Sequence, residues 1–170
     1  MYVSVRALRH HGCALPVEVW LKVDEIPSVT ERARFDALGN VSVHSLADVA
    51  AAFPEVGRQL YPENWGDKPY IAKQLALVSA SCTECLLIDA DNVPTRDPTF
   101  LFDDAHLARA AVLLWPDFWR TRTGPVGIRG IFSLSSTGVL EDARTVESGQ
   151  VVADKRRAWA ALLFAVHLQV

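Results

Sequence analysis

The chain has 170 residues, of which 50% are hydrophobic and 22% charged, and its net charge is -3. This length predicts a single domain, residues 1–170, that can bury a core, and the hydrophobic content excludes a disordered chain. The slight acidity gives no electrostatic footprint for nucleic acid, and apolar stretches such as Ala158–Val166 are too short to cross a membrane.

Helix and strand signals alternate along the first half of the chain, which is typical of an α/β protein. A helix is predicted over Tyr2–His11, before a glycine, and a strand over Val17–Leu21, where apolar and polar residues alternate. A second helix is predicted over Thr30–Leu38 with Thr30 as its N-cap. A short strand at Val41–Val43 follows, and then a loop rich in proline and glycine.

The second half of the chain continues the alternation. Its strands are short apolar runs, and an aspartate that can act as N-cap precedes its last helix. The predicted elements are a helix over Tyr70–Ser81, strands over Leu86–Ile88, Ala110–Leu114 and Val146–Ala153, the last broken by Gly149, and a helix over Lys155–Leu168 capped by Asp154.

Two carboxylates, Asp89 and Asp91, follow the Leu86–Ile88 strand directly. On an extended strand their side chains point to one side, with Cα atoms about 6.5 Å apart. Hard oxygen ligands in such a pair favour Mg²⁺ or Mn²⁺, with water and nucleotide phosphates completing the shell. The alternative is a plain turn, because the following residues are rich in turn formers. The pattern therefore predicts a metal site but leaves the turn open.

The run KQLALVSASCTECLLIDADNVPTRDPTFLFD, followed by LLWPDFW and ESGQVVADKRRAW, resembles the fungal α-mannosyltransferase family that includes the Golgi α-1,3-mannosyltransferases. The resemblance extends from about Arg9 to Ala165. It implies a GT-A-like, Rossmann-like nucleotide-sugar transferase sheet with flanking helices. It also implies GDP-mannose as donor, Mn²⁺ (or Mg²⁺) held through Asp89 and Asp91, and transfer with retention of configuration to a mannose-terminated glycan or glycoprotein.

The resemblance carries expectations about the chain's extent and location as well. Compared with the family pattern, the first strand and the C-terminal part are missing, so we expect a transferase domain truncated at both ends. Family members are typically Golgi proteins, which implies the Golgi lumen, with a membrane anchor upstream of Met1.

Five residues are candidates for contact with the donor sugar nucleotide. Lys73 lies sixteen positions before Asp89, a spacing similar to that of a basic residue that contacts the donor in retaining GT-A enzymes, and the alternative is a solvated surface lysine. Asn92 could bind donor or metal water, or form an Asx turn. Trp115, Asp117 and Trp119 follow a predicted strand end, where they could stack on a sugar and accept its hydroxyls, or form an aromatic plug with a turn aspartate.

The segment Glu147-Ser148-Gly149-Gln150 resembles the stretch beside the sugar pocket in the family. Gly149 would let the backbone approach the ligand closely, with Gln150 beside it. Glu147 is the candidate catalytic carboxylate, because an anion near the anomeric carbon stabilises an oxocarbenium-like transition state. Whether it acts as nucleophile or only contacts the sugar stays open.

Two other functions fit parts of the sequence. An apolar strand ending in Asp-x-Asp also describes a phosphatase of the haloacid dehalogenase class, with Asp89 as nucleophile and Asp91 as acid-base group. That class needs a later acidic pair, whereas only Asp154 neighbours Lys155. The second alternative is a non-catalytic remnant of a transferase.

Cys82 and Cys85 form a CxxC pattern at the end of a predicted helix. Redox CxxC motifs instead begin a helix after a strand. We therefore predict that both cysteines pack in the core or are half-buried, rather than forming a redox site.

Overall fold

The computed structural model describes residues 1–55, 58, 71–120 and 144–168, and it has a mixed α/β fold with two small sheets. In the first sheet β1 (Val17–Leu21) pairs in parallel with β2 (Val41–Ser45). The second has the antiparallel order β3–β5–β4. Its strands are β3 (Glu84–Ile88), β4 (Val112–Arg120) and β5 (Arg144–Asp154).

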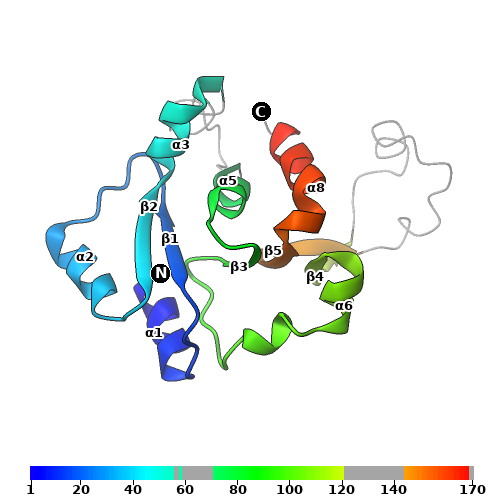
Figure 1. Cartoon of the computed structure of the whole chain (residues 1–170), viewed down its shortest axis with the longest axis horizontal. Coiled ribbons are helices and arrows are strands. Elements are labelled where there is room, and N and C mark those ends of the chain that lie inside the picture. The colour runs from blue at the N-terminus through cyan, green and yellow to red at the C-terminus, as the bar shows by residue number, and fades with distance from the viewer. Residues whose placement is uncertain (56–57, 59–70, 121–143, 169–170) are drawn as a thin grey trace.

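Helices fill the space beside and between the two sheets (Figure 1). Helix α5 lies between the β1–β2 sheet and α8, and the β4–β5 hairpin extends to the side (Figure 1). The helices are α1 (Tyr2–His10), α2 (Val29–Asp36), α3 (Leu46–Ala52), α5 (Ile71–Ser79), α6 (Ala105–Ala110) and α8 (Lys155–His167), with a 3₁₀ turn, η2, at Thr99–Leu101.

Helix α5 belongs to two core clusters and so fixes the position of the segment that follows it. Its Ile71 and Leu75 pack with Leu46 of α3 and Val166 of α8. Two residues after Leu75, and so on the other side of the helix, Leu77 packs with residues of β3 and β5. Because both faces of α5 are anchored, its remaining side chains and the start of β3 have fixed positions relative to each other.

Local sequence signals place most elements correctly. Strand β1 has the predicted bounds, α1 ends one residue early at His10, and α8 begins at Lys155 with the side chain of Asp154 accepting from Arg156 N, as predicted. The prediction of an α/β class is therefore confirmed. The described residues contain no helix with the length and apolar character needed to cross a bilayer.

The start of α2 differs from the prediction. Its N-cap is Ser28, not Thr30, because Ser28 and Glu31 form a capping box. Ser28 Oγ accepts from Glu31 N at 3.2 Å, and Glu31 Oε2 accepts from Ser28 N at 2.8 Å. Two backbone donors are satisfied at once, which a cap at Thr30 would not achieve.

Other differences concern helices α3 and α6 and strand β5. Helix α6 was not predicted, and it includes Ala110, the predicted first residue of the strand that begins at Val112. The α3 helix was not predicted from the sequence; it begins after Ser45, whose side chain accepts from Ala47 N. Strand β5 continues through Gly149 without a break, because Ile88 pairs with Gln150 and holds this part of β5 in the ladder.

The packing prediction for the CxxC cysteines is confirmed for Cys85 and wrong for Cys82. Cys82 and Cys85 form a disulfide, and Cys82 is exposed. Only Cys85 is buried, at 4% exposure. The tight connection between α5 and β3 brings the Cα atoms of Cys82 and Cys85 to 5.6 Å, which is within the range of a disulfide. The spacing in the sequence does not reveal this distance.

The half-buried carboxylate of Glu18, on β1, connects the first sheet to the end of α5. Its Oε1 accepts from Ser81 N at 2.9 Å and from the Ser81 hydroxyl, and its Oε2 accepts from Trp20 Nε1 at 3.1 Å. Burial opposes ionisation, but these hydrogen bonds and the nearby His44 outweigh it, so the pKa of Glu18 lies below its ordinary value.

We expect Glu18→Gln to lower the free energy of unfolding by about 1 kcal/mol at pH 7, a modest value because the carboxylate is partly exposed. A carboxylate with a lowered folded-state pKa stabilises above its unfolded pKa, and this contribution is lost as pH falls through the folded value. The difference between wild type and variant should therefore close in acid, as measured by urea unfolding from pH 7 to pH 3. Asp24→Asn, at an exposed loop carboxylate, is the control; a pH-independent difference at Glu18 would contradict the assignment.

Candidate functional site

The acidic pair lies in a turn rather than on an extended strand. Strand β3 ends at Ile88, and Asn92 N donates to the carbonyl of Asp89 at 3.0 Å. The prediction that Asp89 and Asp91 point to one side of a strand is therefore wrong, because the pair lies in the turn that the following residues favour. The reason is local chemistry: turn-forming residues follow the strand, and a backbone bond closes the turn. A turn does not exclude a bound ion, and the metal site stays a prediction. Asp89 is half-buried and Asp91 is exposed.

Lys73 reaches the first carboxylate from helix α5. Its Nζ lies 2.6 Å from Asp89 Oδ2, and the side chains are 28% and 24% exposed. The same Nζ lies 3.3 Å from Ser148 Oγ on β5. Lys73 is therefore not a solvated surface lysine, because its charge is paired with Asp89 at the junction of α5, β3 and β5.

Gly149 sits at the centre of this junction. Its carbonyl accepts from Asp89 N at 2.8 Å and from Asn92 Nδ2 at 2.9 Å. Its own N–H donates to Glu147 Oε1 at 2.7 Å. The structure thus brings together five predicted site residues, Lys73, Asp89, Asn92, Glu147 and Gly149, whose positions in the chain are as much as 76 residues apart.

The close packing around Gly149 leaves no room for a side chain. An added Cβ would lie 2.7 Å from Asn92 Nδ2 and 3.0 Å from Glu147 Oε1. We expect Gly149→Ala to lower the free energy of unfolding by about 1–3 kcal/mol, because Asn92 must move and lose its hydrogen bond. Urea unfolding measures the change.

A double-mutant cycle identifies the group responsible for that cost. If Asn92 is the group displaced, Asn92→Ala should cost much less in the Gly149→Ala background than in wild type. Additive costs of the two substitutions would show that the close contact at Gly149 is not with Asn92.

An open cleft of about 610 Å³ adjoins the cluster. Strand β3, the loop after the acidic turn and η2 form its walls, so it lies at the carboxyl end of β3. Four predicted site residues line it, and they are Asp91, Asn92, Trp115 and Gln150. Trp115 pairs with Glu147 in the β4–β5 ladder, so the tryptophan joins the cleft to the Glu147 strand.

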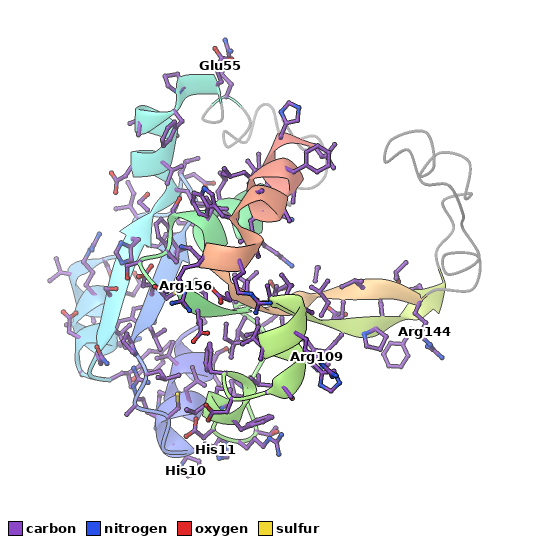
Figure 2. All side chains as sticks on the ribbon, turned by 45° about the vertical axis from the view of Figure 1, so that its right-hand side comes forward. His10, His11, Glu55, Arg109, Arg144 and Arg156 are labelled. Carbon is purple, nitrogen blue, oxygen red and sulfur yellow. A yellow bond between two sulfur atoms is a disulfide. The ribbon has the colours of Figure 1, made fainter. Side chains whose placement is uncertain are left out.

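Asp117 and Trp119 do not line the cleft. They were predicted to follow a strand end, but β4 continues to Arg120, so both lie within the strand. Asp117 Oδ2 accepts from Thr145 Oγ1 at 3.2 Å, and Trp119 is 65% exposed. Figure 2 shows Arg144 at the outer end of this hairpin, away from the helices. Strand β4 passes through Pro116 because it is an edge strand with register shifts.

Ser4 supports the acidic turn and was missed in the sequence. It is buried on the apolar side of α1, and its Oγ donates to the carbonyl of Ala90 at 3.1 Å. Ala90 lies between the two carboxylates, so this hydrogen bond connects α1 to the acidic turn. A buried serine beside Val5 and Leu8 was the available signal, but it names no partner.

The fold and this geometry define an α/β protein with a polar cluster and a cleft at one strand end. The Mannosyl_trans3 family model, which describes mannosyltransferases, matches residues 1–133. The chain therefore belongs to this mannosyltransferase family.

Curated relatives agree with the family assignment. The chain is 30% identical over 73% of its length to alpha-1,2-mannosyltransferase MNN2 of Candida albicans, covering 20% of that protein. It is 28% identical over 74% of its length to alpha-1,2-mannosyltransferase MNN2 of Saccharomyces cerevisiae, covering 20%. It is also 28% identical over 72% of its length to alpha-1,2-mannosyltransferase MNN21 of Candida albicans, covering 19%.

The match covers a small part of each relative. The chain spans about a fifth of the length of these curated relatives. Their names specify α-1,2 transfer, whereas the motifs had suggested a family that includes α-1,3 enzymes. No solved structure matches the chain.

Proposed function

We propose that the chain forms the donor-binding part of a metal-dependent, retaining mannosyltransferase that uses GDP-mannose. The product is an α-1,2-linked mannose on a mannose-terminated glycan or glycoprotein, as the names of the relatives suggest. The observation that carries the proposal is the junction of Lys73, Asp89 and Gly149 beside the cleft. A GT-A-like sheet and a Golgi location are part of the same proposal.

The acidic turn has the donor set for a hard divalent cation. Asp89 and Asp91 would hold Mn²⁺ or Mg²⁺ through carboxylate oxygens, and Lys73 contacts only one oxygen of Asp89. The described residues contain no group of three or more histidine, cysteine, aspartate or glutamate side chains placed to hold a metal ion. The two aspartates would therefore leave the rest of the shell to water and phosphate. When bound, the ion would supply Lewis-acid stabilisation of the diphosphate leaving group.

Glu147 would be the carboxylate that acts on the sugar: it does not line the cleft itself, but its strand partner Trp115 does. It is half-buried, and the Gly149 N–H fixes its Oε1. A fixed anion beside the cleft would stabilise positive charge as it develops on the mannosyl ring. Asn92, Gln150 and Trp115 would orient the sugar, because they line the cleft.

The phosphatase alternative gains no support from the structure. Its remaining acidic residue, Asp154, caps α8, and Lys155 Nζ donates to the carbonyl of Val78 at 3.0 Å. Both side chains are thus occupied away from Asp89. Membership of a mannosyltransferase family also favours sugar transfer.

A transfer assay with the purified chain tests the proposal. GDP-mannose, Mn²⁺ and α-mannobiose are expected to yield GDP and an α-1,2-linked trisaccharide, detected by mass spectrometry and mannosidase digestion. In parallel, p-nitrophenyl phosphate reports the phosphatase alternative. Phosphate release that Asp89→Asn abolishes, without sugar transfer from any donor, would contradict the proposal. Binding of GDP without transfer would favour the non-catalytic remnant.

A further inference from the structure

Arg96 lies in the loop between the acidic turn and η2, stacked on an aromatic ring. Its guanidinium carbon is 3.8 Å from the centroid of Phe100, and both residues are exposed. Within the described part of the chain, Arg96 makes no ion pair or hydrogen bond. The guanidinium therefore lies over the ring, and its N–H donors are not engaged by other described residues.

The charges in the cleft make Arg96 distinctive. Asp91 and Arg96 are the charged residues that line the cleft. Two other described cations lie near the acidic turn: Lys73 is paired with Asp89 at 2.6 Å, and the N-terminal ammonium of Met1 donates to the carbonyl of Ala90. Among the described residues that line the cleft, Arg96 is therefore the cation that an anionic ligand would meet.

A stacked guanidinium suits phosphate in particular. Its planar fork can bind two phosphate oxygens at once, which an ammonium cannot do. A diphosphate between the acidic turn with its ion and Arg96 would have positive charge on both sides. In a transferase this charge stabilises the diphosphate as it leaves the sugar.

We propose that Arg96 binds the diphosphate of the sugar nucleotide in this cleft. This inference rests on the proposed function, since it names a residue of the same donor site. It goes further in assigning the phosphate contact to Arg96 rather than to Lys73, and in giving Phe100 the role of holding the guanidinium plane.

Inorganic pyrophosphate tests the assignment without the nucleoside or the sugar. Calorimetry would measure its affinity, with and without Mn²⁺, for wild type, Arg96→Gln and Arg96→Lys. We expect Arg96→Gln to weaken binding at least about tenfold and Arg96→Lys to recover only part of it, because the bidentate contact is lost. Phe100→Leu should cause a smaller loss.

Arg6→Gln is the matched control. Arg6 is an exposed arginine near an aromatic ring, 6.0 Å from the centroid of Tyr2, and it is not part of the cleft lining. The control removes the same charge, so its pyrophosphate affinity should equal that of wild type.

The outcomes separate this inference from the proposed function. Equal pyrophosphate affinity in wild type and Arg96→Gln, or no binding by wild type, overturns the role of Arg96. Mannose 6-phosphate is the second probe in the same calorimetry. If Arg96→Gln weakens the binding of mannose 6-phosphate but not of pyrophosphate, the role of Arg96 is overturned too, because the site would then bind the phosphate of an acceptor. Failure of mannose transfer, with Arg96-dependent pyrophosphate binding intact, rejects the proposed function and leaves the phosphate site standing.

Discussion

GDP with Mn²⁺ is expected to raise the melting temperature of the wild-type chain, and replacing both Asp89 and Asp91 by asparagine is expected to abolish that rise. A ligand at a hundredfold excess over its Kd adds about 2.7 kcal/mol of stability through binding to the folded state. If the two carboxylates hold the ion, their neutral amides bind it weakly and that stabilisation disappears. Differential scanning fluorimetry with GDP, with Mn²⁺ and with both measures the effect.

The single variants separate the two carboxylates. Asp89→Asn also removes the partner of Lys73, so it should lower the melting temperature before any ligand is added. Asp91 is exposed, so Asp91→Asn should affect only the ligand-dependent shift. This contrast distinguishes loss of the ion pair from loss of the metal.

A matched double control is Asp24→Asn with Asp103→Asn, which removes two exposed carboxylates elsewhere in the fold. Its GDP-dependent shift should equal that of wild type. A full shift in Asp89→Asn with Asp91→Asn would remove both residues from the metal site.

Glu147→Gln is expected to lower kcat at least about a hundredfold, with little change in the KM for the donor. In the wild-type chain Gly149 N donates to Glu147 Oε1 at 2.7 Å. The amide oxygen of glutamine can accept the same hydrogen bond, so the backbone geometry should be preserved. What the substitution removes is the negative charge, which acts mainly in the transition state. Steady-state kinetics with GDP-mannose and a mannoside acceptor measure both constants.

Glu84→Gln provides the comparison for Glu147. Glu84 lies on β3, and its Oε1 is 3.8 Å from Arg156 in a partly exposed ion pair outside the cleft. The same change of charge there should leave kcat unaltered. If Glu147→Gln raises only the KM for the acceptor, Glu147 binds substrate; near-normal kinetics would make it a structural residue.

Local sequence determined the elements whose signals lie within a few residues. The alternation in Val17–Leu21 predicts β1, and Asp154 predicts the start of α8, because period and capping act over one or two turns. The same locality explains the error at α2, where a Ser28–Glu31 box overrides a threonine two residues later.

The Asp-x-Asp motif predicted the position of the acidic pair but not its backbone conformation. The pattern located Asp89 and Asp91 at the end of a strand, and resemblance placed the chain in a mannosyltransferase family that the family model confirms. The pattern did not decide between strand and turn. The structure shows the turn, closed by the bond from Asn92 N to the carbonyl of Asp89, and the carbonyl of Gly149 accepts from Asp89 N and holds the start of the turn against β5.

Only the tertiary structure decided which candidates share a site. Packing of α5 on both sides brings Lys73 to Asp89, and pairing of β3 with β5 brings Gly149 to Asn92. The same pairing leaves Trp119 exposed on the edge strand, away from the cleft. Contacts between residues far apart in the chain depend on how whole elements pack, and no short sequence window contains that information.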